Sequence, residues 1–115
     1  MLPLLSAGRL AVCGMTELEV LYSVRSAEEH RRVRVELRGL ERLATPDEVW
    51  DRAVDVHSAL AERGLHRAVA IPDLIVAAVA ERHSISVLHY DLDFDVIAEV
   101  TQQPVEWVVP PGTAD

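Results

Sequence analysis

Four acidic residues have the types and spacing for metal-dependent chemistry: Glu19, Asp73, Asp91 and Asp93. Each follows a predicted strand or lies near the start of a predicted helix. In a parallel α/β sheet these junctions share one edge, where ligands bind. Carboxylates brought together repel one another unless a divalent cation neutralises them, and hard oxygen ligands select Mg²⁺ or Mn²⁺. Such a site suits phosphodiester hydrolysis, in which the metal activates water and stabilises the leaving oxygen.

Each of these acids also has a purely structural interpretation. Asp73 could complement the dipole of a helix N-terminus, which is worth about 0.3 to 1 kcal/mol. Asp93 could be the N-cap of the helix that follows it. Glu19 lies on an amphipathic helix, where surface glutamates are routine and Glu17 is an equal candidate on local grounds. Arg67 could reach a phosphate near the acids, although a solvated arginine is the alternative.

Other kinds of site find no support in the sequence. It has no Gly-x-Ser-x-Gly elbow, no Gly-rich phosphate loop and no dinucleotide fingerprint. Its five histidines lack metal-ligand spacing, and the single Cys13 excludes an internal disulfide and a zinc-thiolate cluster. The formal net charge of -8 predicts that nucleic acid would be handled through a metal and not through a basic surface.

The pattern of apolar residues and start signals predicts strands alternating with helices. The helix starts are Thr16, Ser26 in a capping box, Pro46 at a first helical position, and Pro72; Gly39 and Gly64 are expected to end two of the helices. The predicted strands are 9–13, 85–90 and 105–109, and the predicted helices are 17 onward, 27–39, 46–64, 71–83 and 93–100. Apolar residues surround the helix at 71–83, so it should be the most buried.

This alternation predicts an α/β fold with a mostly parallel sheet in a single domain, residues 1–109, followed by a flexible tail at 110–115. The 115 residues are enough for one core and too few for two. No run of apolar residues is long enough for a membrane span, and the opening residues lack the pattern of a secretory signal. We therefore expect a cytoplasmic protein.

Three segments resemble a known family. Residues 71–78 (IPDLIVAA) and 87–95 (VLHYDLDFD) resemble the carboxyl half of a PIN-domain ribonuclease of the VapC toxin type. The interval of 18 residues from Asp73 to Asp91 is the one expected between the family's third and fourth acidic positions. Residues 16–23 (TELEVLYS) resemble the second acidic motif, in which the functional Glu lies three residues after a Thr. That register selects Glu19.

The resemblance implies a three-layer PIN-like sandwich and a Mg²⁺- or Mn²⁺-dependent endoribonuclease toxin that acts on RNA. By this resemblance, Asp73, Asp91 and Asp93 hold or orient the metal, and Glu19 binds it through water or positions the attacking water. The implied partners are a VapB-type antitoxin and a second copy of the chain in a homodimer.

The sequence departs from the family in one respect. The family opens with a hydrophobic strand that ends in a metal-binding Asp, whereas no Asp occurs here before Asp47. We expect a truncated or degenerate copy whose first central strand is missing, with unpaired strand edges at that place and weak or no activity. The alternatives are a catalytically dead remnant that binds an antitoxin or another protein, and an acidic structural domain without metal.

Overall fold

The structure, a computed structural model, describes residues 4–6, 9–89 and 92–107. The predicted tail at 110–115 lies outside these residues. The described strands are β1 (Leu4–Ser6), β2 (Arg9–Val12), β3 (Glu41–Arg42), β4 (Ser86–His89) and β5 (Val105–Trp107). The described helices are α1 (Gly14–Tyr22), α2 (Ala27–Arg38), α3 (Asp47–Glu62), α4 (Ile71–Arg82) and α5 (Leu92–Thr101). None of these helices is both long and apolar enough to cross a membrane.

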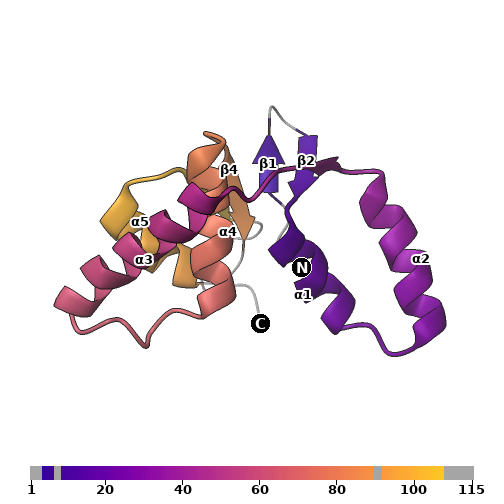
Figure 1. Ribbon diagram of the computed structural model, residues 1–115, viewed down its shortest axis with the longest axis horizontal. Helices are drawn as coiled ribbons and strands as arrows, with labels where there is room; N and C mark the ends of the chain where they lie inside the picture. The colour runs from indigo at the N-terminus through magenta and orange to yellow at the C-terminus, as the bar shows by residue number, and fades with distance from the viewer. Residues whose placement is uncertain (1–3, 7–8, 90–91, 108–115) are drawn as a thin grey trace.

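The five strands form one sheet in the order β3-β2-β1-β4-β5 (Figure 1). β2 pairs with β3 and β4 pairs with β5 in parallel, while β1 runs antiparallel to both β2 and β4. Four of the five strands therefore point the same way, and the predicted α/β class with a mostly parallel sheet is confirmed. From the sequence we expected the first central strand to be missing and the edges of its neighbours to be unpaired. In the structure β1 occupies that position and pairs with both neighbours.

The predicted first residue is correct for α2, whereas α1 begins earlier in the chain than predicted. Ser26 caps α2 as predicted, because its Oγ accepts a hydrogen bond from the Glu29 N–H at 3.1 Å. Thr16 is not the N-cap of α1, since the helix begins at Gly14 and Cys13 is the capping residue. The Thr16 hydroxyl accepts a hydrogen bond from the Cys13 N–H at 2.8 Å. This bond gives the Cys13 N–H a partner at the junction between β2 and α1. This contact lets the helix start directly after the strand.

The two glycines expected to end helices behave differently. Gly64 has a φ of 72°, the left-handed conformation that glycine adopts at low cost, and it follows the end of α3. Gly39 caps α2 with a right-handed φ of -76°, so the left-handed ending predicted there is wrong. Its N–H donates to the Glu36 carbonyl at 3.1 Å, and a tight right-handed turn carries the chain from α2 into β3.

Helices α3, α4 and α5 pack together into the larger part of the molecule (Figure 1). The buried face of α3 consists of the predicted residues Val49, Ala53, Val56 and Leu60. Helix α4 is buried continuously from Asp73 to Ala80, which confirms it as the most buried helix. Phe94 and Ile97 of α5 close the same core.

Helices α1 and α2 form a smaller part, which we call the arm. α2 packs chiefly against α1, and Figure 1 shows it projecting away from α3, α4 and α5. The arm has its own small core, built on Val12, Leu21 and Leu37 with half-buried neighbours Val20, Val33 and Leu40. This core shares no buried residue with the larger one, although Met15 of α1 packs against the larger core.

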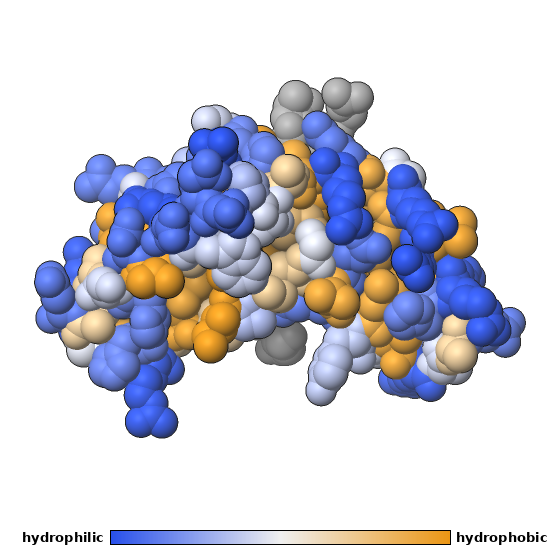
Figure 2. Space-filling model, viewed as in Figure 1, coloured by the Kyte–Doolittle hydropathy of each residue, from blue (hydrophilic) through white to orange (hydrophobic). Residues whose placement is uncertain are grey.

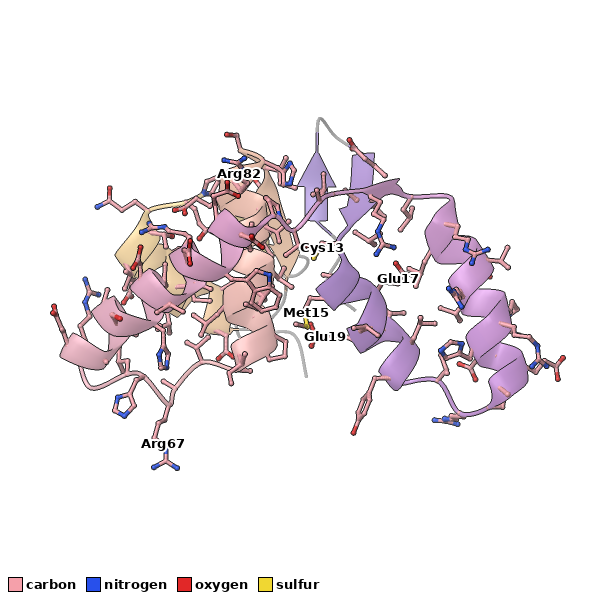
Figure 3. The ribbon with its side chains drawn as sticks, viewed as in Figure 1. Cys13, Met15, Glu17, Glu19, Arg67 and Arg82 are labelled. Carbon is pink, nitrogen blue, oxygen red and sulfur yellow. The ribbon has the colours of Figure 1, made fainter. Side chains whose placement is uncertain are left out.

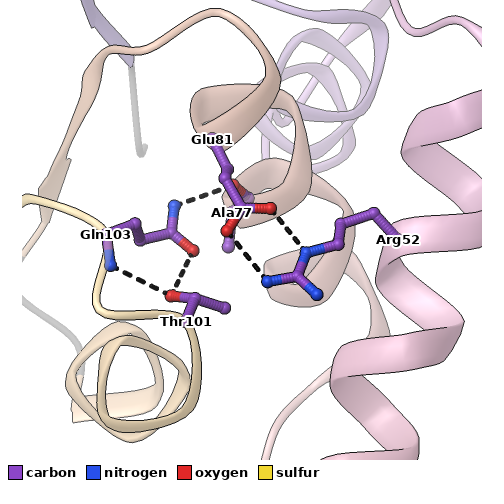
Figure 4. Close-up of polar contacts among 5 residues, drawn as sticks. All are labelled: Arg52, Ala77, Glu81, Thr101 and Gln103. Atoms are coloured by element: carbon purple, nitrogen blue, oxygen red, sulfur yellow. Dashed lines mark hydrogen bonds and ion pairs between the residues drawn. The ribbon is translucent and has the colours of Figure 1, made fainter.

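Polar contacts fix the helices around α4 (Figure 4). The buried Gln103, which follows α5, donates from its side-chain amide to the Ala77 carbonyl in the middle of α4 at 2.8 Å. Its Oε1 accepts from the Thr101 hydroxyl at 2.8 Å. On the other side of α4, Arg52 of α3 makes a two-point contact with Glu81, at 2.6 and 3.1 Å.

We predict that Gln103→Ala destabilises the protein by about 1 to 2 kcal/mol, because it removes a buried hydrogen bond to α4 and the acceptor of the Thr101 hydroxyl. Urea denaturation followed by circular dichroism measures the free energy of unfolding. The control is Gln102→Asn at the exposed neighbour, where Asn tolerates the positive φ of 60° and a change within about 0.5 kcal/mol is expected. Equal stability of Gln103→Ala and the unsubstituted protein would contradict the assigned role.

Candidate functional site

The predicted site residues belong to elements whose ends meet at one edge of the sheet. β2 and β4 run in the same direction, so their carboxyl ends share an edge, and α1 and α5 begin there (Figure 1). Helix α4 leads into β4 through the short turn 83–85, which places the start of α4 at the same edge. The topology thus brings together the chain segments that carry Glu19, Asp73 and Asp93.

Asp73 and Asp93 meet at the first residues of α4. Ala70 is the N-cap of that helix, and its N–H donates to Asp93 Oδ2 at 3.1 Å. Asp73 is the third residue of the helix, and its own N–H donates to the Ala70 carbonyl at 3.1 Å. Asp73 is only 5% exposed. The Asp93 carboxylate therefore lies at the start of the helix whose third residue is Asp73.

The structural interpretation of Asp93 requires a correction. Asp93 is not the N-cap of α5, because α5 begins one residue earlier, at Leu92. Its carboxylate instead binds the N-cap residue of the neighbouring helix α4. A carboxylate at this position complements the positive end of the α4 dipole, and Asp73 in the first turn has the same effect. A role as helix caps and a role as metal ligands are compatible with the same placement.

Glu19 and Glu17 lie on opposite sides of α1. Figure 3 shows Glu19 and Met15 on the side of α1 that faces α4, and Glu17 on the side that faces α2. Glu17 is engaged in an ion pair with Arg42 of β3. Among the described residues Glu19 has no such partner. The placement supports the choice of Glu19 over Glu17 that the family register indicates.

Glu19 also has a perturbed ionisation. Partial burial removes water from its carboxyl group and raises its pKa above the ordinary value of 4.5, although the residue as a whole is exposed. Burial is the largest of the causes that act on this pKa.

The fit to a metal ion rests on the chemistry of the donors. Asp73 and Asp93 supply carboxylate oxygens, which are the ligands that Mg²⁺ and Mn²⁺ prefer. Within the part of the chain that the structure describes, no three His, Cys, Asp or Glu residues are grouped closely enough to hold a metal. The fourth predicted acid, Asp91, lies outside the described residues. The four-acid site therefore stays a prediction. The structure places the Asp93 carboxylate and the residue Asp73 at the start of α4, with Glu19 on the neighbouring helix α1.

Two further features of this region bear on function. Arg67 points away from the molecule at the turn before α4 (Figure 3) and is exposed, as a solvated arginine would be. Between α3 and α4 lies an apolar groove of about 260 Å³, visible as hydrophobic surface in Figure 2, whose lining includes Trp50, Val54 and Ile71. Sequence reasoning missed this groove, although apolar residues four positions apart on the exposed side of α3 were a signal of it.

Comparisons with known proteins agree with this geometry. The model of the PIN domain family matches residues 2–100. Ribonuclease VapC21 of Mycobacterium tuberculosis is 57% identical over 113 residues, which cover 97% of this chain and 82% of that protein. Ribonuclease VapC51 of the same species is 44% identical over 113 residues, which cover 98% of this chain and 82% of that protein.

A solved structure extends the likeness to the fold. The crystal structure of VapBC-5 from Mycobacterium tuberculosis, a member of the VapBC family of toxin-antitoxin systems, matches with a TM-score of 0.60 and 25% identity. The match covers 84% of this chain and 76% of that one. The resemblance seen in the acidic motifs is thereby confirmed over most of the chain, which belongs to the PIN-domain family and, within it, to the VapC ribonucleases.

Proposed function

We propose that this chain is a Mg²⁺- or Mn²⁺-dependent endoribonuclease, the toxin of a toxin–antitoxin pair whose partner is a VapB-type antitoxin. The observation that supports the proposal is the contact of the Asp93 carboxylate with the Ala70 N–H, at the start of the helix whose third residue is the buried Asp73. The VapC relatives and the VapBC neighbour support the substrate class and the partner.

The proposed roles follow from the placement of each side chain. Asp73 and Asp93, together with Asp91, would hold the cation, and the Ala70 N–H would fix the orientation of the Asp93 carboxylate. A bound divalent cation activates water and stabilises the leaving oxygen. Glu19, on the side of α1 that faces α4, would orient the attacking water. Its raised pKa makes this carboxylate a better proton acceptor than an ordinary surface glutamate.

The competing functions have less support. A dead remnant that only binds a protein would not need to keep Asp73 buried beside a second acid at the start of α4. An acidic structural domain without metal would account for the helix-capping contact of Asp93, but not for a third acid, Glu19, on the facing side of α1. The cytoplasmic location stays a prediction.

We further infer that two copies associate through the groove between α3 and α4. Trp50, Val54 and Ile71 leave 48%, 64% and 71% of their surface exposed, and they lie together around the groove. A contiguous group of exposed apolar side chains often marks a protein–protein interaction site. A symmetric dimer would bury each patch against its copy.

We predict that Asp73→Asn reduces Mg²⁺-dependent cleavage of single-stranded RNA by at least about 100-fold, because substituting even an outer-shell partner of a metal site costs 10- to 100-fold. Cleavage of labelled RNA under single-turnover conditions, with enzyme in excess, makes weak activity measurable. We expect weak basal cleavage, since none of the residues before Asp47 supplies the Asp that opens the family's site.

The matched control is Asp51→Asn, which changes the charge equally at an exposed position on α3 and should leave the rate unchanged. Cleavage that survives Asp73→Asn would refute the proposed site. Robust cleavage by the unsubstituted chain would instead show that the family's first Asp is dispensable.

The raised pKa of Glu19 predicts a pH-dependent stability. The folded state holds a proton on Glu19 more tightly than the unfolded state does, so this group favours folding below about pH 4.5 and the advantage is lost as pH rises through its folded pKa. Glu19→Gln should therefore raise the Tm at pH 7 and have little effect below pH 4.

Millimolar Mg²⁺ should raise the Tm of the unsubstituted protein at pH 7, because it binds the folded, ionised form, and this rise should be lost in Asp73→Asn. Differential scanning fluorimetry with and without EDTA measures both effects. A Tm that responds to neither pH nor Mg²⁺ would favour the acidic structural domain.

For the dimer, we predict that Val54→Glu shifts the protein from dimer to monomer in sedimentation equilibrium, because it places a charge in the apolar groove. The control is Val35→Glu on α2, where the side chain is 67% exposed and lies outside the groove. An unsubstituted protein that remains monomeric at all concentrations, or a Val54→Glu variant that remains dimeric, would exclude this interface.

A further inference from the structure

Positive charge is concentrated in residues 25–42, which contain α2 and β3. Residues 25–42 contain six of the 11 arginines and four acids, a net charge of +2, whereas the remaining residues contain five arginines and 15 acids, a net charge of -10. The overall charge of -8 led us to exclude a basic surface. The total charge averages over two segments of opposite sign, so it does not describe the surface of α2.

Helix α2 further separates its own charges. Successive residues of a helix are about 100° apart, so Arg31, Arg34 and Arg38 fall within about 60° of one another. Glu29 and Glu36 fall on the opposite side of the helix. The three arginines are exposed, and none of them has an ion pair within the described part of the chain. We call Arg31, Arg34 and Arg38 the arginine face of α2.

The arginine face borders a hollow between α1 and α2. The hollow has a volume of about 400 Å³, and its lining includes Arg34, His30 and Arg42 on the side of α2 and β3, with Leu18 and Leu21 on α1. Glu17 also lines it, but its charge is compensated by the ion pair with Arg42. Figure 2 shows hydrophilic side chains over the outer part of the arm.

We propose that the arginine face of α2 binds the phosphate backbone of the RNA substrate. This inference rests on the proposed ribonuclease function. A protein whose remaining residues carry a net charge of -10 repels a polyanion over most of its surface, so a local group of unpaired cations is needed to retain one. Arginine suits this role, because its planar guanidinium binds two phosphate oxygens at once.

The placement of the face agrees with a substrate-binding role. The arm joins the rest of the molecule through α1, and α1 carries Glu19 on its other side. RNA held along α2 would therefore lie one helix away from the acids at the start of α4. Contacts to phosphate position a strand without reading its bases, so the face contributes affinity and orientation and no sequence preference.

The test is the affinity for a fluorescein-labelled single-stranded RNA, measured by anisotropy in EDTA over a series of salt concentrations. We expect the double variant Arg31→Gln/Arg38→Gln to bind at least 10-fold more weakly than the unsubstituted chain at low salt. The slope of log affinity against log salt should fall by about 1.4, because each lost phosphate contact contributes about 0.7. Circular dichroism should show an unchanged fold.

The matched control is Arg63→Gln/Arg82→Gln, which removes the same charge from exposed positions outside the arm and should weaken binding less than 3-fold. Equal weakening by both double variants would overturn the proposal, since net charge alone would explain it. The proposal would also fail if the arm variant kept RNA binding and lost binding to poly-glutamate, because the face would then serve an acidic protein.

Cleavage in Mg²⁺ separates this proposal from the function on which it rests. A chain that binds RNA through the arginine face but cleaves none would support the face and contradict the ribonuclease. A chain that cleaves RNA with the same affinity and rate in the arm variant would support the ribonuclease and contradict the face.

Discussion

The burial of α4 is the constraint on which the other features depend. Eight consecutive residues of this helix, Asp73 to Ala80, are buried, and one of them is a carboxylic acid. A helix so enclosed cannot leave its polar groups to water, so neighbouring elements must supply partners. Gln103 supplies such a contact to the buried Ala77 carbonyl at the middle of the helix. At its exposed start the Asp93 carboxylate accepts from the Ala70 N–H, close to the buried Asp73 in the first turn.

A metal-dependent ribonuclease must bind both a cation and a polyanion, and this chain carries the charges suited to each in different segments. A group of carboxylates that holds a divalent cation is negative by necessity, and this makes the surroundings unfavourable for a polyanionic substrate. The charge distribution resolves this conflict by distance. Acids predominate in the part built on α3, α4 and α5, whereas arginines outnumber acids in residues 25–42, which contain α2. Because the arm has a separate small core, its charges can be arranged without disturbing the packing around α4.

Much of the fold could be predicted from the sequence because its signals are local. The helical spacing of Val49, Ala53, Val56 and Leu60 predicts their burial, and Ser26 predicts the start of α2. Some errors concern contacts between residues far apart in the sequence, and others concern local contacts that the start signals did not reveal. β1 pairs locally with β2 and over a long sequence distance with β4, while the start of α1 depends on the hydrogen bond from the Cys13 N–H to Thr16, three residues on. The contact of Asp93 with Ala70 joins residues 23 positions apart, so spacing alone suggested the wrong helix for Asp93 to cap.

Helix α1 lies between the proposed metal centre and α2, which carries the arginine face. The positions of Thr16, Glu17 and Glu19 on α1 determine which neighbouring element each acid faces. Thr16 fixes the start of the helix, and that start sets the rotation of every residue after it. With this rotation Glu19 falls on the side of α4, while Glu17, two residues earlier, falls on the side of α2 and pairs with Arg42. A helix starting one residue later would turn both carboxylates by about 100° and separate each from its partner element. The spacing of a Thr and a Glu three residues apart therefore encodes the orientation of α1 as well as the identity of an acid.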